Sequence, residues 1–250
     1  MPTRQSGDKK YYELLSRIPK SVTAEIAKQY RDSDSRLDDP AHTDLGSALT
    51  RICNTLSHPK VLDLGCGCGR QFRFLQGAET IVGVDVSTEM LKQAEHPAGE
   101  EQISAKVELI CGDVFNLNFP DNSFDLIYSC GLFGLWVPLD DFILKKISRW
   151  LKPGGAAFLV IIDASSPRTT TWKGRLASSL RKFLPNPVRR YLDARPGSMF
   201  LKLYESELRN LMAGANFDFT IWQRGNPARR IDLVCEARKP ESGKLGTESN

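Results

Sequence analysis

Residues 61 to 69 read Val-Leu-Asp-Leu-Gly-Cys-Gly-Cys-Gly, an apolar run with one carboxylate that passes directly into three glycines at alternate positions. Glycine has no Cβ and tolerates positive φ, so Gly65, Gly67 and Gly69 allow a tight turn whose backbone N–H groups can approach a ligand closely. A larger side chain would fill the space that the ligand needs. The pattern therefore predicts a buried strand that ends at a small-molecule site.

A loop of this kind follows the first strand of doubly wound sheets that bind two classes of ligand. A dinucleotide site has the spacing G-x-G-x-x-G, and Arg70 stands where its third glycine would be, so that fingerprint fails. The spacing present is D-x-G-x-G-x-G, with Asp63 two residues before Gly65. It resembles the first motif of the class I S-adenosylmethionine-dependent methyltransferases.

The next apolar run, residues 81–85, ends in a carboxylate twenty positions after Gly65. An acid at the carboxyl end of a strand can accept hydrogen bonds from both hydroxyls of a ribose, so Asp85 is the predicted ribose ligand. Ser87 is the predicted N-cap of the following helix. Val86 and Met90 offer apolar surface for an adenine ring.

Two further segments continue the resemblance. Residues 107–114 predict a third strand, after which the resemblance places Asp113 on the adenine amino group and the Val114 N–H on a ring nitrogen. Residues 116–129 include Phe-Pro-Asp-Asn-Ser-Phe-Asp, which is very close to the family's F-P-D-x-S-F-D and predicts a turn before a fourth strand. Asp125 begins this strand, away from the ligand edge, and is expected to be structural.

The end of the motif series is a helix predicted at 138–151, which Pro153 and two glycines terminate before a fifth strand at 156–162. The resemblance implies an α/β fold: a doubly wound, seven-stranded, mostly parallel Rossmann-like sheet with an antiparallel closing hairpin. It is nearest to the small-molecule branch that includes ubiquinone and menaquinone methyltransferases. The implied cofactor is S-adenosyl-L-methionine, with S-adenosyl-L-homocysteine as product.

The resemblance and the loop chemistry together give a set of expected cofactor contacts. Ser129 is included because its carbonyl should accept from the methionine amino group, and Tyr30 because the family often brings a tyrosine from an N-terminal helix. A plain packing role remains open for Tyr30. The full set is Tyr30, Asp63, Gly65, Cys66, Gly67, Gly69, Asp85, Val86, Met90, Asp113, Val114 and Ser129.

Simpler interpretations remain for several of these residues. Asp63 could cap the glycine turn, and Asp113 could be an ordinary turn acid. Cys66 and Cys68 form a C-x-C, yet no second cysteine or histidine pair lies at ligand spacing, so no metal is expected.

Composition favours one soluble domain with appendages, since 250 residues with 41% hydrophobic content can bury a sizeable core. Six scattered cysteines and an N-terminus without an apolar leader indicate the cytoplasm. Apolar spacing predicts N-terminal helices at 11–31 and 44–57, a helix at 204–215 and strands at 217–222 and 230–237. The expected divisions are an N-terminal helical cap (1–57), the cofactor-binding core (58–163), a basic insertion (164–200), the end of the core (201–239) and a disordered tail (240–250).

The segment 164–198 carries eight basic residues against one acid and includes a basic amphipathic helix that begins near Trp172. Three roles are open: a helix packed on the core, a lid over the acceptor pocket, or docking on an anionic membrane surface or acidic carrier. Nucleic acid is an unlikely partner, because the net charge is only +4 and no binding module is recognised. The oligomeric state is left open.

The residues after the fourth strand define the expected acceptor side. Cys130, Phe133 and Trp136 are candidate walls for an apolar or aromatic small molecule, methylated on oxygen, nitrogen or carbon. Quinone C-methyltransferases carry Gly-Leu-Arg-Asn here, whereas this chain has Gly-Leu-Phe-Gly, which places a quinone acceptor in doubt. His42 is the candidate base. The alternative function is a cofactor-binding protein of the same fold that regulates or cyclises without methylating.

Overall fold

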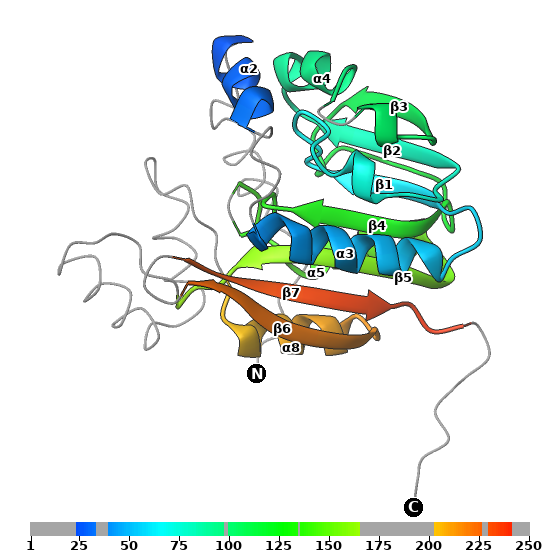
Figure 1. Cartoon of the computed structure of the whole chain (residues 1–250). Helices are drawn as coiled ribbons and strands as arrows, with labels where there is room; N and C mark the ends of the chain where they lie inside the picture. Colours follow the sequence, from blue (N-terminus) through cyan, green and yellow to red (C-terminus); the bar gives the residue numbers. More distant parts are fainter. Residues whose placement is uncertain are drawn as a thin grey trace, which may run out of the picture.

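The structure is a computed structural model that describes residues 24–33, 40–97, 100–134, 136–165, 203–226 and 230–241. Its centre is a seven-stranded sheet with the order β3-β2-β1-β4-β5-β7-β6 (Figure 1). The first five strands run parallel, and β7 pairs antiparallel with both β5 and β6. This arrangement confirms the predicted fold. The strands are β1 (Lys60–Leu64), β2 (Thr80–Asp85), β3 (Lys106–Cys111), β4 (Phe124–Cys130), β5 (Leu151–Ile162), β6 (Asp218–Asn226) and β7 (Arg230–Arg238).

The strand order reverses between β1 and β4. From β1 the chain continues outward to β2 and β3 on one side of the sheet, and it returns to β4 and β5 on the other. Ligands of open α/β sheets bind beyond the carboxyl ends of the strands at such a switch point. The glycine turn that follows Leu64 lies at this point.

Helices cover both faces of the sheet (Figure 1). One face packs against α3 (Pro40–Asn54) and α4 (Thr88–Ala94), and the other against α5 (Asp141–Trp150) and α8 (Glu205–Gly214). The predicted apolar side of α3 is buried, because Leu45 and Leu49 are at most 2% exposed. The helix α2 (Ala24–Ser33) lies beside α4.

Element boundaries differ from the sequence predictions where distant segments provide hydrogen-bond partners. The helix expected at 138–151 begins only at Asp141, because Asp140 caps it by accepting the Ile143 N–H at 3.1 Å. The strand expected from residue 156 already begins at Leu151. Its early residues are held extended by the end of β7: the Gly154 N–H donates to the Lys239 carbonyl at 2.9 Å.

The remaining boundaries are close to the predictions. The helix expected at 44–57 is α3, shifted by a few residues, and α2 is the described part of the helix expected at 11–31. The strand expected at 217–222 continues to Asn226. Most of the basic insertion and nearly all of the predicted tail lie outside the described residues. Within the described ranges, no helix combines the length and hydropathy that a membrane crossing requires.

Candidate functional site

The glycine turn after β1 is fixed against the end of β2. The N–H groups of Gly65 and Cys66 both donate to the Val84 carbonyl, at 2.8 and 3.0 Å. Gly65, Gly67 and Gly69 have φ values of 76°, 55° and 76°, in the region that favours glycine. The predicted tight turn is therefore present.

The three glycines have different roles. A Cβ at Gly65 would lie 2.9 Å from the Leu132 Cβ, and one at Gly69 would lie 2.8 Å from the Phe72 ring, so both positions are needed for packing. A Cβ at Gly67 would meet nothing within 4 Å. Gly67 is thus the glycine that borders open space, where a ligand can approach the backbone.

Asp85 faces this open space from the end of β2. Its Oδ2 accepts the Gly67 N–H at 3.0 Å, and its Oδ1 accepts the Ser87 N–H at 2.9 Å. Each oxygen of a carboxylate can accept more than one hydrogen bond, so the fixed carboxylate can also accept from ligand hydroxyls. Ser87 is the N-cap of α4, as predicted: its Oγ accepts the Met90 N–H at 3.2 Å.

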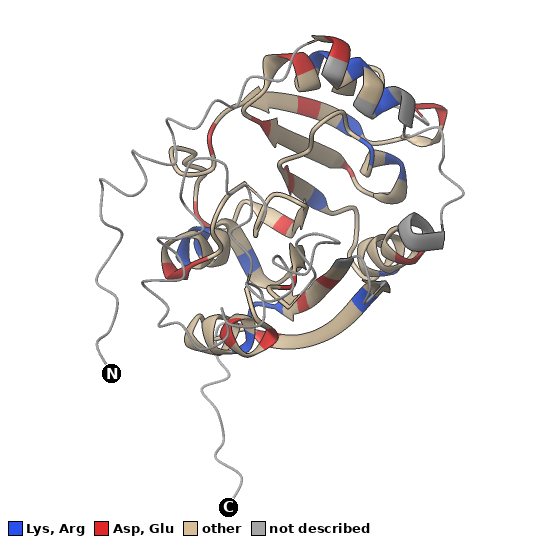
Figure 2. Ribbon diagram, turned by 90° about the vertical axis from the view of Figure 1, so that its left-hand side faces the viewer, with Lys and Arg blue, Asp and Glu red and all other residues tan. Residues whose placement is uncertain are grey.

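Asp63 lies behind the turn and is only 2% exposed. Burial first, and then the charge of Asp85, raise the pKa of this carboxyl well above its ordinary value. A positive charge placed nearby would stabilise the ionised form. The electrostatics of the turn therefore favour a cationic ligand. Figure 2 looks onto this edge of the sheet, where acidic residues, in red, recur at strand ends.

The turn after β3 is held by its own acid and by α5. Asp113 Oδ1 accepts the Phe115 N–H at 3.1 Å, which is the turn role that the sequence left open. Lys146 of α5 donates from Nζ to the carbonyls of Val114 and Phe115, at 3.0 and 2.8 Å. Partial burial lowers the pKa of Lys146, and Asp113 opposes that change. Sequence reasoning missed Lys146, although its place between the buried Ile143 and Ile147 could have drawn notice.

The carboxyl end of β4 lies on the other side of the switch point. Ser129 is fully buried, and its Oγ donates to the Leu64 carbonyl at 2.9 Å, which joins β4 to β1. Cys130 is half-buried, and Trp136 is 46% exposed. Phe133, in contrast, is 0% exposed, because the loop folds back and packs this ring into the core. Phe133 is a core residue here and does not line an accessible wall.

Comparisons with known proteins match this geometry to one family. A family model described as a methyltransferase domain matches residues 61–155. A demethylmenaquinone methyltransferase of Listeria welshimeri is 31% identical over 170 residues, which cover 66% of this chain and 70% of that protein. This chain belongs to the class I S-adenosylmethionine-dependent methyltransferases.

Other members of the methyltransferase family are more distant or longer. A sterol 24-C-methyltransferase of Gibberella zeae is 38% identical over 99 residues, which cover 38% of this chain and only 26% of that protein. A phosphoethanolamine N-methyltransferase of Haemonchus contortus, solved with phosphomonomethylethanolamine and S-adenosylhomocysteine, has the same fold, with a TM-score of 0.62 and 18% identity. The alignment covers 92% of this chain and 60% of that one.

The residues of this methyltransferase fit S-adenosylmethionine. The space at Gly67 that a Cβ would fill admits the ligand to the backbone, and Asp85 stands beside it with a fixed carboxylate. The buried acid Asp63 suits a ligand that carries positive charge. Val86 is 38% exposed and Met90 half-buried, so both are accessible from the same edge. The contacts of all the expected residues with the cofactor, those of Asp85 and Gly67 included, remain predictions.

His42 and Tyr30 lie on the two N-terminal helices, and two other histidines lie on the surface. His42 lies in the first turn of α3, at the carboxyl end of the sheet, and Tyr30 lies on α2 (Figure 1). Both side chains are outside the described part of the structure, so their roles stay predictions. His58 is exposed before β1, and His96 is exposed and lies 3.2 Å from Glu100. Neither lies where the sequence placed the ligand.

Residue Asp125 is structural, as expected. Its Oδ2 accepts the Lys60 N–H at 2.9 Å, and Lys152 pairs with it at 2.8 Å. These contacts join β1, β4 and β5 at the amino ends of the strands. Cys66 and Cys68 are both buried, at 7% and 5% exposure.

The structure also reveals polar groups that sequence reasoning did not assign to the site. Tyr128 of β4 lies in the core: it is 1% exposed, and its ring stacks on Phe158. Its buried hydroxyl has no hydrogen-bond partner. Arg224 of β6 and Asp232 of β7 are largely buried near the carboxyl end of β5. No local sequence pattern indicates this position of Arg224, because only strand pairing brings it there.

Proposed function

We propose that this protein transfers the methyl group of S-adenosylmethionine to an oxygen, nitrogen or carbon atom of a small molecule with an apolar or aromatic body. The observation that carries the proposal is the open space at Gly67, bordered by the fixed carboxylate of Asp85. Half-buried Cys130 and exposed Trp136 follow on the neighbouring side of the switch point, where an acceptor could enter.

The cofactor supplies a methyl group that is already activated by the positive sulfur. The protein therefore has mainly to hold and aim two molecules. Near-attack positioning can contribute roughly 7–11 kcal/mol of a barrier, whereas a positioned base adds about 10²–10⁴-fold in rate. Positioning, the larger of these two effects, depends on the turns that follow β1, β2 and β4. His42 is the candidate base for an acceptor that must lose a proton.

The chemical class of the methyl acceptor is proposed from different observations than methyl transfer itself. The names of the relatives include a demethylmenaquinone and a sterol methyltransferase, so extended apolar acceptors are reasonable candidates. The loop Gly131-Leu132-Phe133-Gly134 differs from the Gly-Leu-Arg-Asn of quinone C-methyltransferases, which argues against a quinone. We favour an acceptor whose apolar body contacts Trp136. We retain the cytoplasm as the proposed compartment because none of the six cysteines, all within the described residues, forms a disulfide.

The basic insertion is proposed to act near the acceptor or at an acidic surface. It carries eight basic residues against one acid over 164–198. Two roles follow from its charge and its apolar spacing: a lid, or docking on an anionic membrane or acidic carrier.

Transfer is tested with S-adenosylmethionine that carries a radiolabelled methyl group, incubated with the protein and pooled small metabolites. We expect label in an organic-soluble product, and one S-adenosylhomocysteine released per methyl transferred. Cofactor binding is measured in parallel by calorimetry. Binding without transfer to any pool would support the non-methylating alternative instead.

A further inference from the structure

One buried ion pair near the carboxyl end of β5 has unusual geometry. Arg224 and Asp232 are register partners in the closing hairpin, and their side chains are only 13% and 10% exposed. The shortest distance between the guanidinium and the carboxylate is 4.0 Å. The exposed pairs are tighter: Arg51 lies 2.7 Å from Glu236. The Arg224–Asp232 pair is therefore more buried than the Arg51–Glu236 pair and yet has the longer distance between its charged atoms.

This geometry leaves the guanidinium incompletely compensated. Hydrogen bonds between nitrogen and oxygen span about 2.7–3.2 Å, so a separation of 4.0 Å is an ion pair without a good hydrogen bond. Nη1 of Arg224 is buried and has no hydrogen-bond partner. A buried charge is unfavourable unless it is both paired and hydrogen-bonded. An additional anionic oxygen would complete the arrangement.

A second buried group without a partner lies on the same face of the sheet. Tyr128 belongs to a buried cluster against which the partly buried Trp222 packs. Arg224 is two residues from Trp222, so its side chain leaves β6 on the same face. The Tyr128 hydroxyl also has no hydrogen-bond partner. Burial first, and then Cys130 and the charge of Asp63, raise the pKa of Tyr128, whereas the charge of Arg224 lowers it. Arg224 and Tyr128 thus lie on one face of the sheet, each with a buried polar atom that has no hydrogen-bond partner.

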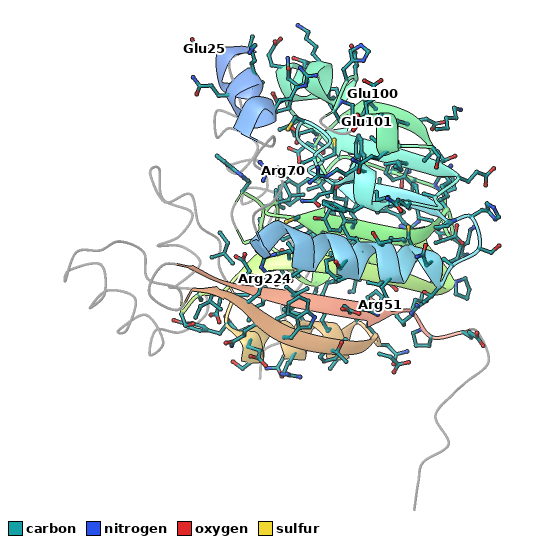
Figure 3. All side chains as sticks on the ribbon, in the orientation of Figure 1. Glu25, Arg51, Arg70, Glu100, Glu101 and Arg224 are labelled. Atoms are coloured by element: carbon teal, nitrogen blue, oxygen red, sulfur yellow. The ribbon has the colours of Figure 1, made fainter. Side chains whose placement is uncertain are left out.

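The position of these groups matches the expected acceptor side. Strand register places Ile162, the last residue of β5, opposite Asp232, which in turn pairs with Arg224. Cys130 pairs with Val160 near the same end. Figure 3 shows Arg224 toward this end of the sheet, and Arg51, on α3, farther toward the amino ends of the parallel strands.

We propose that Arg224, together with Tyr128, binds an anionic oxygen of the methyl acceptor, so that the acceptor carries a carboxylate or phosphate in addition to its apolar body. This inference rests on the proposed function, because it takes the bound anion to be part of the methyl acceptor. A guanidinium has five N–H donors in a planar fork, enough to keep Asp232 as a neighbour while it binds a second anion.

The test is calorimetry on the whole chain saturated with S-adenosylhomocysteine, with benzoate and phenyl phosphate as anionic probes and benzamide as the neutral isostere of benzoate. We expect at least one anion to bind about tenfold more tightly than benzamide, as a charge-assisted hydrogen bond provides. Arg224→Met should remove this preference, and Arg224→Lys should retain part of it. Asp232→Asn should strengthen anion binding, because it removes a competing negative charge.

The matched control is Arg51→Met, which removes an exposed arginine of α3 that pairs with Glu236 of β7. It should leave the preference for anions unchanged. Equal binding of benzamide and the anions, failure of both anions to bind, or a preference that survives Arg224→Met would overturn the proposal. Cofactor affinity, measured on each variant, separates this result from failure of the cofactor site or of folding.

Discussion

The carboxyl end of the sheet has two halves that are built differently: one lies beyond β1 and β2, and the other lies beside β4, β5 and the closing hairpin. Beyond β1 and β2, the key polar groups already have partners within the protein: Asp85 accepts from Gly67 and Ser87. On the side of β4, β5 and the closing hairpin, two buried polar atoms have no hydrogen-bond partner: the hydroxyl of Tyr128 and Nη1 of Arg224. The half proposed to bind the cofactor is therefore organised by its own backbone, whereas the half proposed to bind the acceptor keeps two buried polar atoms that a ligand would complete.

The contrast suggests a division of labour between the two halves. A self-supported half can keep one shape whether or not its ligand is bound, which limits the entropy lost on binding. A half with uncompensated buried groups gains more from a ligand with matching chemistry and rejects one without it. We expect the first half to determine cofactor affinity and the second to determine acceptor choice.

The largest expected effect is at the ribose position. Asp85→Ala removes two hydrogen bonds to the turn as well as the proposed ribose contacts. Hydrogen bonds to a charged group contribute about 1.5–3 kcal/mol each, so affinity for S-adenosylhomocysteine should fall by at least roughly 100-fold. Calorimetry measures this, with the exposed Asp121→Ala as control. Unchanged affinity in Asp85→Ala would remove the ribose assignment.

The next effect separates ligand contact from backbone strain. Gly67→Ala introduces a Cβ into the open space at φ 55°, whereas Gly77→Ala does so at φ 82° on a surface turn. Both should lose stability by roughly 1–2 kcal/mol from the left-handed backbone. Only Gly67→Ala should also lose cofactor affinity, by about 30-fold. Equal affinity in the two variants would mean that no ligand approaches Gly67.

A smaller effect tests the junction between the halves. Ser129→Ala removes a buried hydrogen bond to the Leu64 carbonyl, and urea unfolding should show a loss of about 1–2 kcal/mol in stability. Ser123→Ala removes a similar bond to the Pro120 carbonyl at an exposed turn and should cost less than about 1 kcal/mol. Equal losses would show that burial of the β1–β4 junction does not strengthen it.

The smallest expected effect concerns the adenine turn. Lys146→Met removes the donor to two carbonyls of that turn, so affinity for S-adenosylhomocysteine should fall by roughly fivefold. The analogue with hypoxanthine in place of adenine lacks the amino group proposed to contact Asp113, and it should be less sensitive. The neighbouring exposed Lys145→Met is the control. If both ligands lose affinity equally, Lys146 does not act through Asp113.

Features set by neighbouring residues could be predicted from the sequence. The glycine turn, the acid at the end of β2 and the Ser87 cap each lie within one short segment, whose chemistry fixes the local backbone. Features set by distant contacts could not. Leu151 begins a strand because it pairs with Phe124 of β4, and Lys239, more than eighty positions away in sequence, pairs with the following Gly154 and Gly155. Phe133 is buried because its loop folds back onto Val137.

Arg224 shows the same limit at the site itself. Arg224 follows Trp222 in a strand that the alternation of apolar residues predicts, but nothing local indicates that its side chain is buried near the end of β5. That position depends on the order β5-β7-β6, in which the last strand of the chain is not the last strand of the sheet.

The most direct test of the central claim is a crystal structure of the protein with S-adenosylhomocysteine. It should show the ribose hydroxyls within hydrogen-bond distance of the Asp85 carboxylate and the ligand against the backbone at Gly67. The Gly67 and Ser87 N–H groups should still donate to Asp85, as they do here. A ligand bound elsewhere, or an Asp85 carboxylate turned away from the ribose, would contradict the account.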